Sequence, residues 1–129
     1  SLLEGLVWGM RAVRDISETF DEAKSYKESD IAAWIYPDKE EEVDPALIHQ
    51  DWLSIRSTMW NYVGIIRTFK RLDRAKADVG YLINRTNEFY RKARLNPLLL
   101  DLRNGIQTAL IVVEAAFRNR KSRGAHYIA

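Results

Sequence analysis

The 129-residue chain is long enough for one domain with a modest core, and 47% hydrophobic with 29% charged residues is ordinary for a globular protein. A net charge of +2 is too small to indicate a nucleic-acid partner, and no apolar run approaches the roughly 20 residues of a membrane-spanning helix. The chain contains no cysteine, which excludes disulfide and thiolate chemistry and is compatible with a reducing cytoplasm.

The first ten residues, SLLEGLVWGM, start directly on an apolar pattern without a basic leader. Glu4 and Gly5 fall so early that we expect no signal peptide, and we interpret the stretch as part of a longer polypeptide. Apolar residues then recur every three to four positions, which predicts an amphipathic helix over residues 2–24. Ser1 and Glu4 have the spacing of a capping box. Gly5 and Gly9 leave one side of this helix bare, where a bulky neighbour, another backbone or a flat ligand can approach.

The helical pattern fails over residues 25–43, where the sequence is polar, contains Pro37 and ends in a run of acidic residues. Connections of this length are uncommon inside one compact domain. We therefore interpret residues 25–43 as a linker between a first segment, residues 1–24, and a domain formed by residues 44–129. The short apolar island at residues 31–36 is expected to dock as one hydrophobic patch of this linker.

Three further helices are predicted after the linker. The pairs Asp44-Pro45 and Asn96-Pro97 each place an N-cap residue before a proline at the first helical position. Apolar residues recur at alternating spacings of three and four over residues 48–66, and the same rhythm resumes after a turn at residues 68–70. Short connections between such helices favour antiparallel neighbours. The predicted fold class is all-α, an up-down-up three-helix bundle preceded by one extra helix and a linker, with no strand signal.

Few side chains are candidates for catalysis or for metal binding. His49 and His126 have no Glu or Cys beside them at metal-ligand spacing, and we expect both to be ordinary structural or surface histidines. The sequence contains no Gly-rich phosphate loop and no nucleophile motif, so no catalytic residue is assigned. Near the end of the chain, Gly124 is expected to end the last helix in the left-handed conformation. Its neighbours Arg123 and His126 are predicted to contact another domain.

Two basic stretches, residues 67–76 and 118–123, raise the alternative of a nucleic-acid surface. Such a site needs its charges on one face, with stacking aromatic side chains between them. The second stretch lies at a predicted helix C-terminus, where the helix dipole favours cations. We interpret both stretches as solvated surface and expect no nucleic-acid partner.

Three stretches together resemble a known family: SLLEGLVWG, MWNYVGIIRTFKRL and LRNGIQTALIVVEAAFRNRKSRGAHY. They are similar to the C-terminal portion of the L-aspartate oxidase family, in the superfamily of succinate dehydrogenase and fumarate reductase flavoproteins. The ending SRGAHY is shared across the superfamily, and MWNYVGIIRT favours the aspartate oxidase branch. The resemblance covers nearly the whole chain and is faint only across residues 25–43.

The resemblance implies that residues 1–24 are the last helix of an FAD-binding domain and that residues 44–129 form a helical domain packed on it. Ser1 and Leu2 match cofactor-binding positions of the family, where a helix N-terminus would stabilise negative charge on the flavin ring. The family oxidises L-aspartate to iminoaspartate in NAD (quinolinate) biosynthesis, and oxygen or fumarate reoxidises its FAD. The substrate-binding Arg and His residues of the family do not map onto this chain. The chain alone is therefore expected to be inactive and to retain no FAD.

Two alternatives to the aspartate oxidase interpretation stay open. One is the equivalent domain of a succinate dehydrogenase or fumarate reductase flavoprotein subunit, with an iron–sulfur partner and a membrane; the other is a free-standing helical binding module. The aspartate oxidase interpretation implies the cytoplasm and no membrane partner. In the isolated chain, the first helix would lack the sheet and cofactor that should cover Leu3, Leu6, Val7 and Met10. It is expected to pair between copies, to fold onto the bundle or to be poorly ordered.

Overall fold

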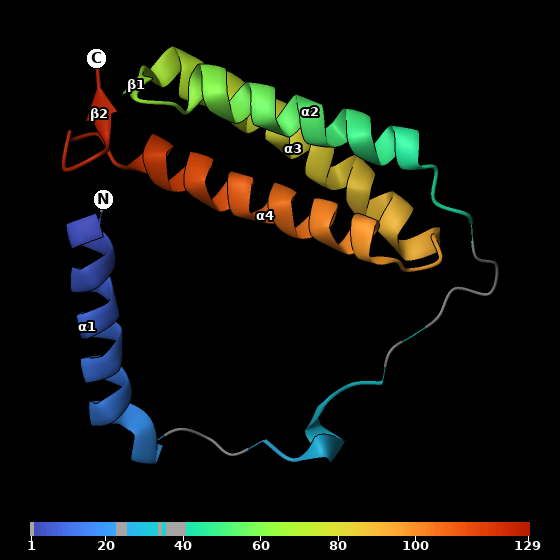
Figure 1. Cartoon of the computed structure of the whole chain (residues 1–129), viewed down its shortest axis with the longest axis horizontal. Helices are drawn as coiled ribbons and strands as arrows, with labels where there is room; N and C mark the ends of the chain where they lie inside the picture. Colours follow the sequence, from blue (N-terminus) through green and yellow to red (C-terminus); the bar gives the residue numbers. More distant parts are fainter. Residues whose placement is uncertain (1, 23–25, 34, 36–40) are drawn as a thin grey trace. The chain divides into compact units, whose positions relative to one another are not determined.

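The computed structural model describes residues 2–22, 26–33, 35 and 41–129 of the chain. It divides into two compact units, Ser1–Tyr36 and Pro37–Ala129, which are described one at a time (Figure 1). The division falls inside the segment predicted to be a linker. The assignment of residues 1–24, 25–43 and 44–129 to domains of a larger protein stays a prediction.

The first unit contains one helix, α1 (Leu2–Thr19), followed by two short 3₁₀ turns, η1 (Phe20–Glu22) and η2 (Glu28–Asp30). The α-helical part is therefore shorter than the predicted range of residues 2–24. Ser1, the other member of the predicted capping box, lies outside the described residues.

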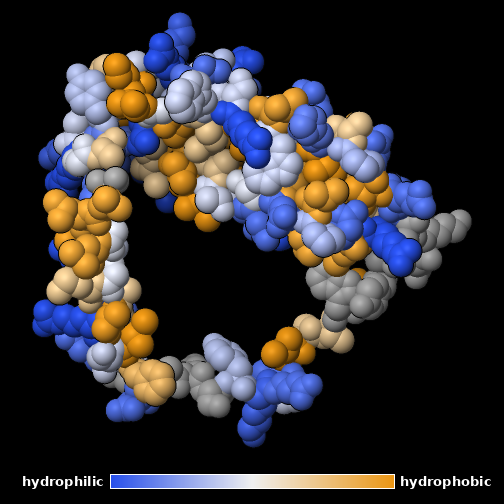
Figure 2. All heavy atoms as spheres, viewed as in Figure 1, coloured by the Kyte–Doolittle hydropathy of each residue, from blue (hydrophilic) through white to orange (hydrophobic). Residues whose placement is uncertain are grey.

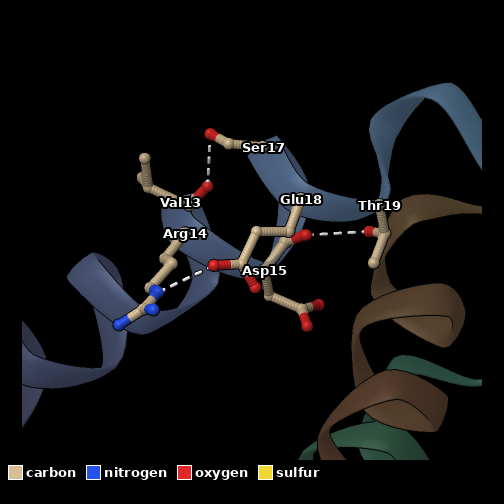
Figure 3. A network of polar contacts seen from close by, with 6 residues as sticks. All are labelled: Val13, Arg14, Asp15, Ser17, Glu18 and Thr19. Atoms are coloured by element: carbon tan, nitrogen blue, oxygen red, sulfur yellow. Dashed lines mark hydrogen bonds and ion pairs between the residues drawn. The ribbon is translucent and has the colours of Figure 1, made fainter.

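Local side-chain bonds gather in the last turns of α1 (Figure 3). Ser17 and Thr19 each donate a hydrogen bond from the hydroxyl to the backbone carbonyl four residues earlier, at 2.8 Å. Such bonds compete with the helical backbone ladder and often bend helices. Arg14 and Glu18 form an ion pair of 2.8 Å on the exposed surface, one turn apart. The 3₁₀ turn η1 follows directly after Thr19.

The apolar side of α1 is uncovered within its unit. No described residue of α1 is buried, and Figure 2 shows apolar side chains spread along the helix. A Cβ atom added at Gly5 or Gly9 would meet nothing within 4 Å. Of the apolar island at residues 31–36, Ile31 and Ile35 are exposed. The docking of the island stays a prediction, and Trp34 and Tyr36 lie outside the described part.

The second unit is a bundle of three helices, α2 (Pro45–Tyr62), α3 (Phe69–Lys92) and α4 (Pro97–Arg118). Every pair of these helices is in contact, and consecutive helices run in opposite directions (Figure 1). The predicted all-α fold, an up-down-up bundle preceded by one extra helix, is confirmed. The largest fully buried side chains, all at positions predicted from the apolar rhythm, are Leu72, Val79, Leu99, Leu102, Ile106 and Val113.

Each helix of the bundle begins at a side-chain cap. The carboxylate of Asp44 accepts a hydrogen bond from a first-turn N–H at 2.8 Å, and the side-chain oxygen of Asn96 accepts one at 2.9 Å. Both predicted starts are confirmed, and Pro45 and Pro97 follow as the first helical residues. Thr68 caps α3 in the same way at 3.2 Å. These caps satisfy backbone donors that the helix itself leaves unpaired.

The helix α2 ends earlier than predicted. Its last residue is Tyr62, so the connection to α3 occupies residues 63–68 and Ile66 lies outside the helix. Gly64 follows the end of α2, and a Cβ atom there would come within 2.6 Å of the carbonyl oxygen of Trp60. The chain therefore needs glycine at the place where it leaves the helix.

A two-residue strand in this connection was not predicted. Strand β1 (Ile66–Arg67) pairs in parallel with strand β2 (Tyr127–Ile128) near the C-terminus, so that α3 and α4 lie between the two strands in the sequence. The expectation of no strands is wrong here, because two residues are too few to show the alternation by which a strand is recognised.

The close approach of α2 and α4 depends on one glycine. A Cβ atom at Gly105 of α4 would lie 2.5 Å from the ring of Trp52 on α2. A real Cβ atom does not occupy that space unless the helices move apart, and an indole ring has few ways to yield. Gly80, in the middle of α3, has no atom within 4 Å of the same added Cβ.

We therefore expect opposite effects from the same substitution at these two positions. Gly105→Ala should lower the free energy of unfolding by about 1–3 kcal/mol, because overpacking outweighs the better helix propensity of alanine. Gly80→Ala should raise it by about 0.5–1 kcal/mol through propensity alone. Urea unfolding of both variants checks this, and stabilisation by both substitutions would contradict the tight Trp52 contact.

Candidate functional site

The residues predicted to contact another domain lie at the end of the bundle where α2 ends, α3 begins and α4 ends (Figure 1). The strands β1 and β2 also lie at this end. The C-terminal residues return to β1 through the parallel pair and through a hydrogen bond of 2.8 Å from the N–H of Ala129 to the carbonyl oxygen of Arg67. This end of the bundle is therefore built from segments that are far apart in the sequence.

The side chain of Arg67 joins these segments. Its Nε donates to the carbonyl oxygens of Val63 at 3.1 Å and Gly64 at 3.0 Å, just after the last residue of α2. Carbonyl groups at a helix C-terminus lack partners in the helix, and a cation there is also favoured by the helix dipole. Its Nη1 lies 2.8 Å from Nδ1 of His126. One planar guanidinium thus links the end of α2 to the C-terminal segment.

The ring of His126 is engaged on both sides. A guanidinium can only donate, so Nδ1 of His126 accepts the hydrogen bond from Arg67. The tautomer that fits carries its hydrogen on Nε2, which lies 2.8 Å from the carbonyl oxygen of Asn119 at the end of α4. His126 therefore has a structural role within its own unit, and its predicted contact with another domain stays a prediction.

Arg123 and His126 are brought together by a tight turn. Their backbones exchange two hydrogen bonds, of 2.9 and 3.0 Å, around Gly124 and Ala125. Gly124 has a φ of 53°, the left-handed conformation that was predicted. Its predicted place at the end of the last helix is wrong, because α4 ends at Arg118 and the positive φ serves this two-residue turn instead. The side chain of Arg123 is exposed.

Four exposed apolar side chains lie at the end of α2, in the connection that follows it and in β2, and we refer to them as the α2-end patch: Trp60, Ile65, Ile66 and Tyr127. A shallow groove of about 700 Å³ borders the patch, lined by residues of the last turn of α2 and by Val63 and Gly64. The sequence does not reveal this patch, because Trp60 and Ile66 fall within residues 48–66, which follow the apolar rhythm of a helix.

The predicted cofactor-binding residues belong to the other unit. Leu2 is the first residue of α1 and is 92% exposed. Ser1 lies outside the described residues. The contact of Ser1 and Leu2 with a flavin stays a prediction.

A second cluster, between α2 and α3, was missed because its members lie on different helices. Asp51 is buried, and one of its carboxylate oxygens accepts a hydrogen bond from the guanidinium of Arg85. Burial raises the pKa of Asp51, while the charge of Arg85 and its hydrogen bond oppose that shift. A small, mainly apolar cavity of about 260 Å³ lies beside the pair. Thr86 lines it, and its buried hydroxyl has no hydrogen-bond partner among the described residues.

The two basic stretches meet at the same end of the bundle. The guanidinium of Arg120 lies 4.9 Å from the ring centre of Phe69, and the ammonium of Lys76 lies 5.6 Å from that of Phe117. The two rings are in edge-to-face contact with their centres 6.3 Å apart. Stacking on rings accounts for these two cations as packing partners. It gives no support to a nucleic-acid surface, because the aromatic faces are occupied by the protein's own side chains.

Residues 52–128 match the family described as the fumarate reductase flavoprotein C-terminal domain. This range contains the Arg67–His126 pair, the α2-end patch and nearly the whole bundle. The chain belongs to this family. Among the part of the chain that the structure describes, no three His, Cys, Asp or Glu side chains form a group that could hold a metal ion. Within the same residues, no helix is both long and apolar enough to cross a membrane.

L-Aspartate oxidases match the chain from one end to the other. The enzyme of Acinetobacter baylyi is 37% identical over 127 residues, which is 98% of this chain and 23% of the relative. That of Yersinia pestis is 38% identical over 127 residues, with 98% and 24% covered. L-Aspartate oxidase 1 of Ralstonia nicotianae is 38% identical over 130 residues, with the same coverage. The resemblance to the C-terminal region of L-aspartate oxidase is confirmed, and the chain spans about a quarter of the length of these curated relatives.

In this member of the flavoprotein C-terminal family, the fork geometry of Arg67 should matter more than its charge. Arg67→Lys keeps the charge but cannot reach two carbonyl oxygens and a ring nitrogen at once, so we expect a loss of about 1–3 kcal/mol in the free energy of unfolding. The amide of Ala129 should also exchange with deuterium faster, since its acceptor is the carbonyl oxygen of Arg67. Arg71→Lys, at an exposed position of α3, is the matched control and should change neither. Equal behaviour of the two variants would contradict the role of Arg67.

The Asp51–Arg85 pair predicts a pH dependence with a definite sign. Because burial raises the pKa of Asp51 in the folded state, the folded chain holds this proton to higher pH than the unfolded chain. This contribution to stability is fully present below the unfolded pKa and is lost as pH rises through the folded pKa. The difference in free energy of unfolding, native chain minus Asp51→Asn, should therefore fall as pH rises from below 3.8 toward neutrality. In a chain that carries Arg85→Gln, this difference should fall more steeply with pH, because the charge that opposes the raised pKa of Asp51 is gone. Urea unfolding across that pH range measures both differences. A difference that rises with pH would refute the raised pKa of Asp51.

Proposed function

We propose that this chain is the C-terminal part of a cytoplasmic, FAD-dependent L-aspartate oxidase. Such an enzyme oxidises L-aspartate to iminoaspartate, with FAD as the hydride acceptor and oxygen or fumarate as the acceptor that reoxidises the flavin. The observation that carries this proposal is the match of L-aspartate oxidases to 98% of the chain, which includes α1 as well as the bundle. The family model alone covers only residues 52–128.

Within this proposal, residues 1–24 are the last helix of the FAD-binding domain, residues 25–43 are a linker and residues 44–129 are the helical domain that packs on it. The uncovered apolar side of α1 supports this division. In this proposal, the rest of the FAD-binding domain covers Leu3, Leu6 and Met10, which are exposed here. The bundle holds no catalytic residue in this proposal.

The start of α1 fits one edge of a flavin site. The first N–H groups of a helix have no acceptor in the helix, and the helix dipole makes this end electropositive. When bound, FAD would accept a hydride from the substrate and gain negative charge. The first-turn N–H groups would face that charge, and Leu2, which is almost fully exposed, would pack against the flavin together with Ser1.

The first test of this proposal compares the chain with the longer polypeptide of which it would be a part. The isolated chain should bind no FAD and should not oxidise L-aspartate, because it holds at most one edge of the site. The longer polypeptide should be purified with bound flavin and should oxidise L-aspartate with oxygen or fumarate as acceptor. Flavin retention measured by absorbance and aspartate turnover decide the matter, and turnover by the isolated chain would overturn the proposal.

The uncovered side of α1 leads to a further prediction for the isolated chain. We expect it to self-associate through α1, since that helix keeps a continuous apolar stripe exposed. Leu6→Ser together with Met10→Ser should abolish the association, and Ile111→Ser, at an exposed position of α4, is the control. Sizing chromatography at several concentrations measures this. A chain that stays monomeric at all concentrations would show that the stripe does not self-associate.

The second candidate is the flavoprotein subunit of a fumarate reductase or succinate dehydrogenase. The description of the matching family favours it, since that family is named for the fumarate reductase flavoprotein. Such a subunit would exchange electrons with an iron–sulfur partner at a membrane. Oxidation of succinate by the longer polypeptide, without oxidation of L-aspartate, would select this candidate.

A further inference from the structure

We propose that the α2-end patch is the surface through which the bundle docks on the flavin-binding part of the same polypeptide. This inference rests on the proposed function, which supplies the flavin-binding part, and it names the face and the side chains that make the contact. The patch consists of Trp60, Ile65, Ile66 and Tyr127.

The exposure of this patch is unusual for the bundle. Ile65 is 85% exposed and Trp60 is 82% exposed, more than any other large apolar side chain described in the second unit. Trp60 lines the groove of about 700 Å³ at the end of α2, and Ile65 lies in the connection that follows. Single exposed apolar residues need no explanation, but Trp60, Ile65 and Ile66 follow one another closely in the sequence, and a group that includes a tryptophan is typical of an interaction site.

The strand pair adds a second apolar surface to the same segment. Ile66 and Tyr127 are register partners in the parallel pair of β1 and β2. Side chains of register partners project from the same side of a sheet, so these two lie next to each other. Both are more than half exposed, whereas Arg67 and Ile128, which project from the opposite side, are partly buried. The ladder therefore presents its apolar side outward.

The patch is held rigidly before any partner binds. Arg67 bonds the two carbonyl groups that precede Ile65 and also holds His126, the residue before Tyr127. The N–H of Ala129 adds a hydrogen bond of 2.8 Å to the carbonyl oxygen of Arg67. A surface fixed in this way loses little conformational entropy on docking, which is the property of a preformed interface. The Arg67–His126 pair thus acts as a positioning device for the exposed side chains.

The occupant follows from the extent of the chain. The L-aspartate oxidases that match it are about four times as long, so about three quarters of such a polypeptide lies outside these 129 residues. The family match spans residues 52–128 and contains the whole patch. This surface belongs to the C-terminal domain of a flavoprotein and is apolar and rigid. Such a surface fits a permanent contact with the remainder of that flavoprotein better than a transient binding partner.

Hydroxyl-radical footprinting of the longer polypeptide and of the isolated chain tests the docking directly. Trp60 should be oxidised about tenfold more slowly in the longer polypeptide, because docking buries it and opening is needed for reaction. Tyr81, which is 64% exposed on α3 outside the patch, is the control and should react at similar rates in both. Equal oxidation of Trp60 in the two proteins would overturn the inference.

Substitutions in the patch give an independent measurement. Trp60→Ser with Ile65→Ser should leave the urea unfolding of the isolated chain unchanged, because both side chains are exposed there. In the longer polypeptide the same pair should speed the proteolytic release of the bundle by about tenfold, and Ile111→Ser should not. A release rate equal to that of the control variant would overturn the inference.

The remaining outcomes separate this inference from other occupants and from the proposed function. Protection of Trp60 that grows with protein concentration would assign the patch to a second copy and would overturn the inference. Protection without bound flavin or aspartate turnover would uphold the docking surface and refute the proposed function. Aspartate turnover with an unprotected Trp60 would uphold the proposed function and refute the docking surface.

Discussion

The guanidinium of Arg67 holds together the end of the bundle on which the candidate surface depends. It donates hydrogen bonds to two carbonyl groups just beyond α2 and another to the ring of His126. The other ring nitrogen of His126 is hydrogen-bonded to the backbone carbonyl of Asn119 at the end of α4. Two helix ends and the C-terminal segment are thereby fixed by one planar group, in a geometry that suits arginine and not lysine.

This constraint explains why apolar side chains can stay exposed there without the segment collapsing. Trp60 and Ile65 flank a backbone whose carbonyl groups are already satisfied, and Tyr127 lies on a strand whose partner is β1. The core of the bundle is completed by other residues, such as Leu72 and Ile106, and needs nothing from the patch. Stability and docking therefore use separate sets of side chains of the same unit.

The parts of the fold that could be predicted are those with a local cause. Asp44 and Asn96 cap helices through bonds to their own first turns, and the rhythm of apolar residues determines which side is buried. The end of α2, the strand pair and the turn at Gly124 could not be predicted, because each depends on a contact between distant segments. Arg67 was counted among surface cations for this reason, and Asp51 and Arg85, 34 residues apart, gave no joint signal. The family resemblance came from three stretches, one in α1 and two in the bundle.

The central claim is that these residues are the C-terminal part of a flavoenzyme specific for L-aspartate. It is tested most directly by anaerobic reduction of the longer polypeptide with L-aspartate and, separately, with succinate. L-Aspartate should bleach the visible absorbance of the bound flavin in a single turnover, and succinate should not. Reduction by succinate alone, or a polypeptide that carries no flavin, would contradict it.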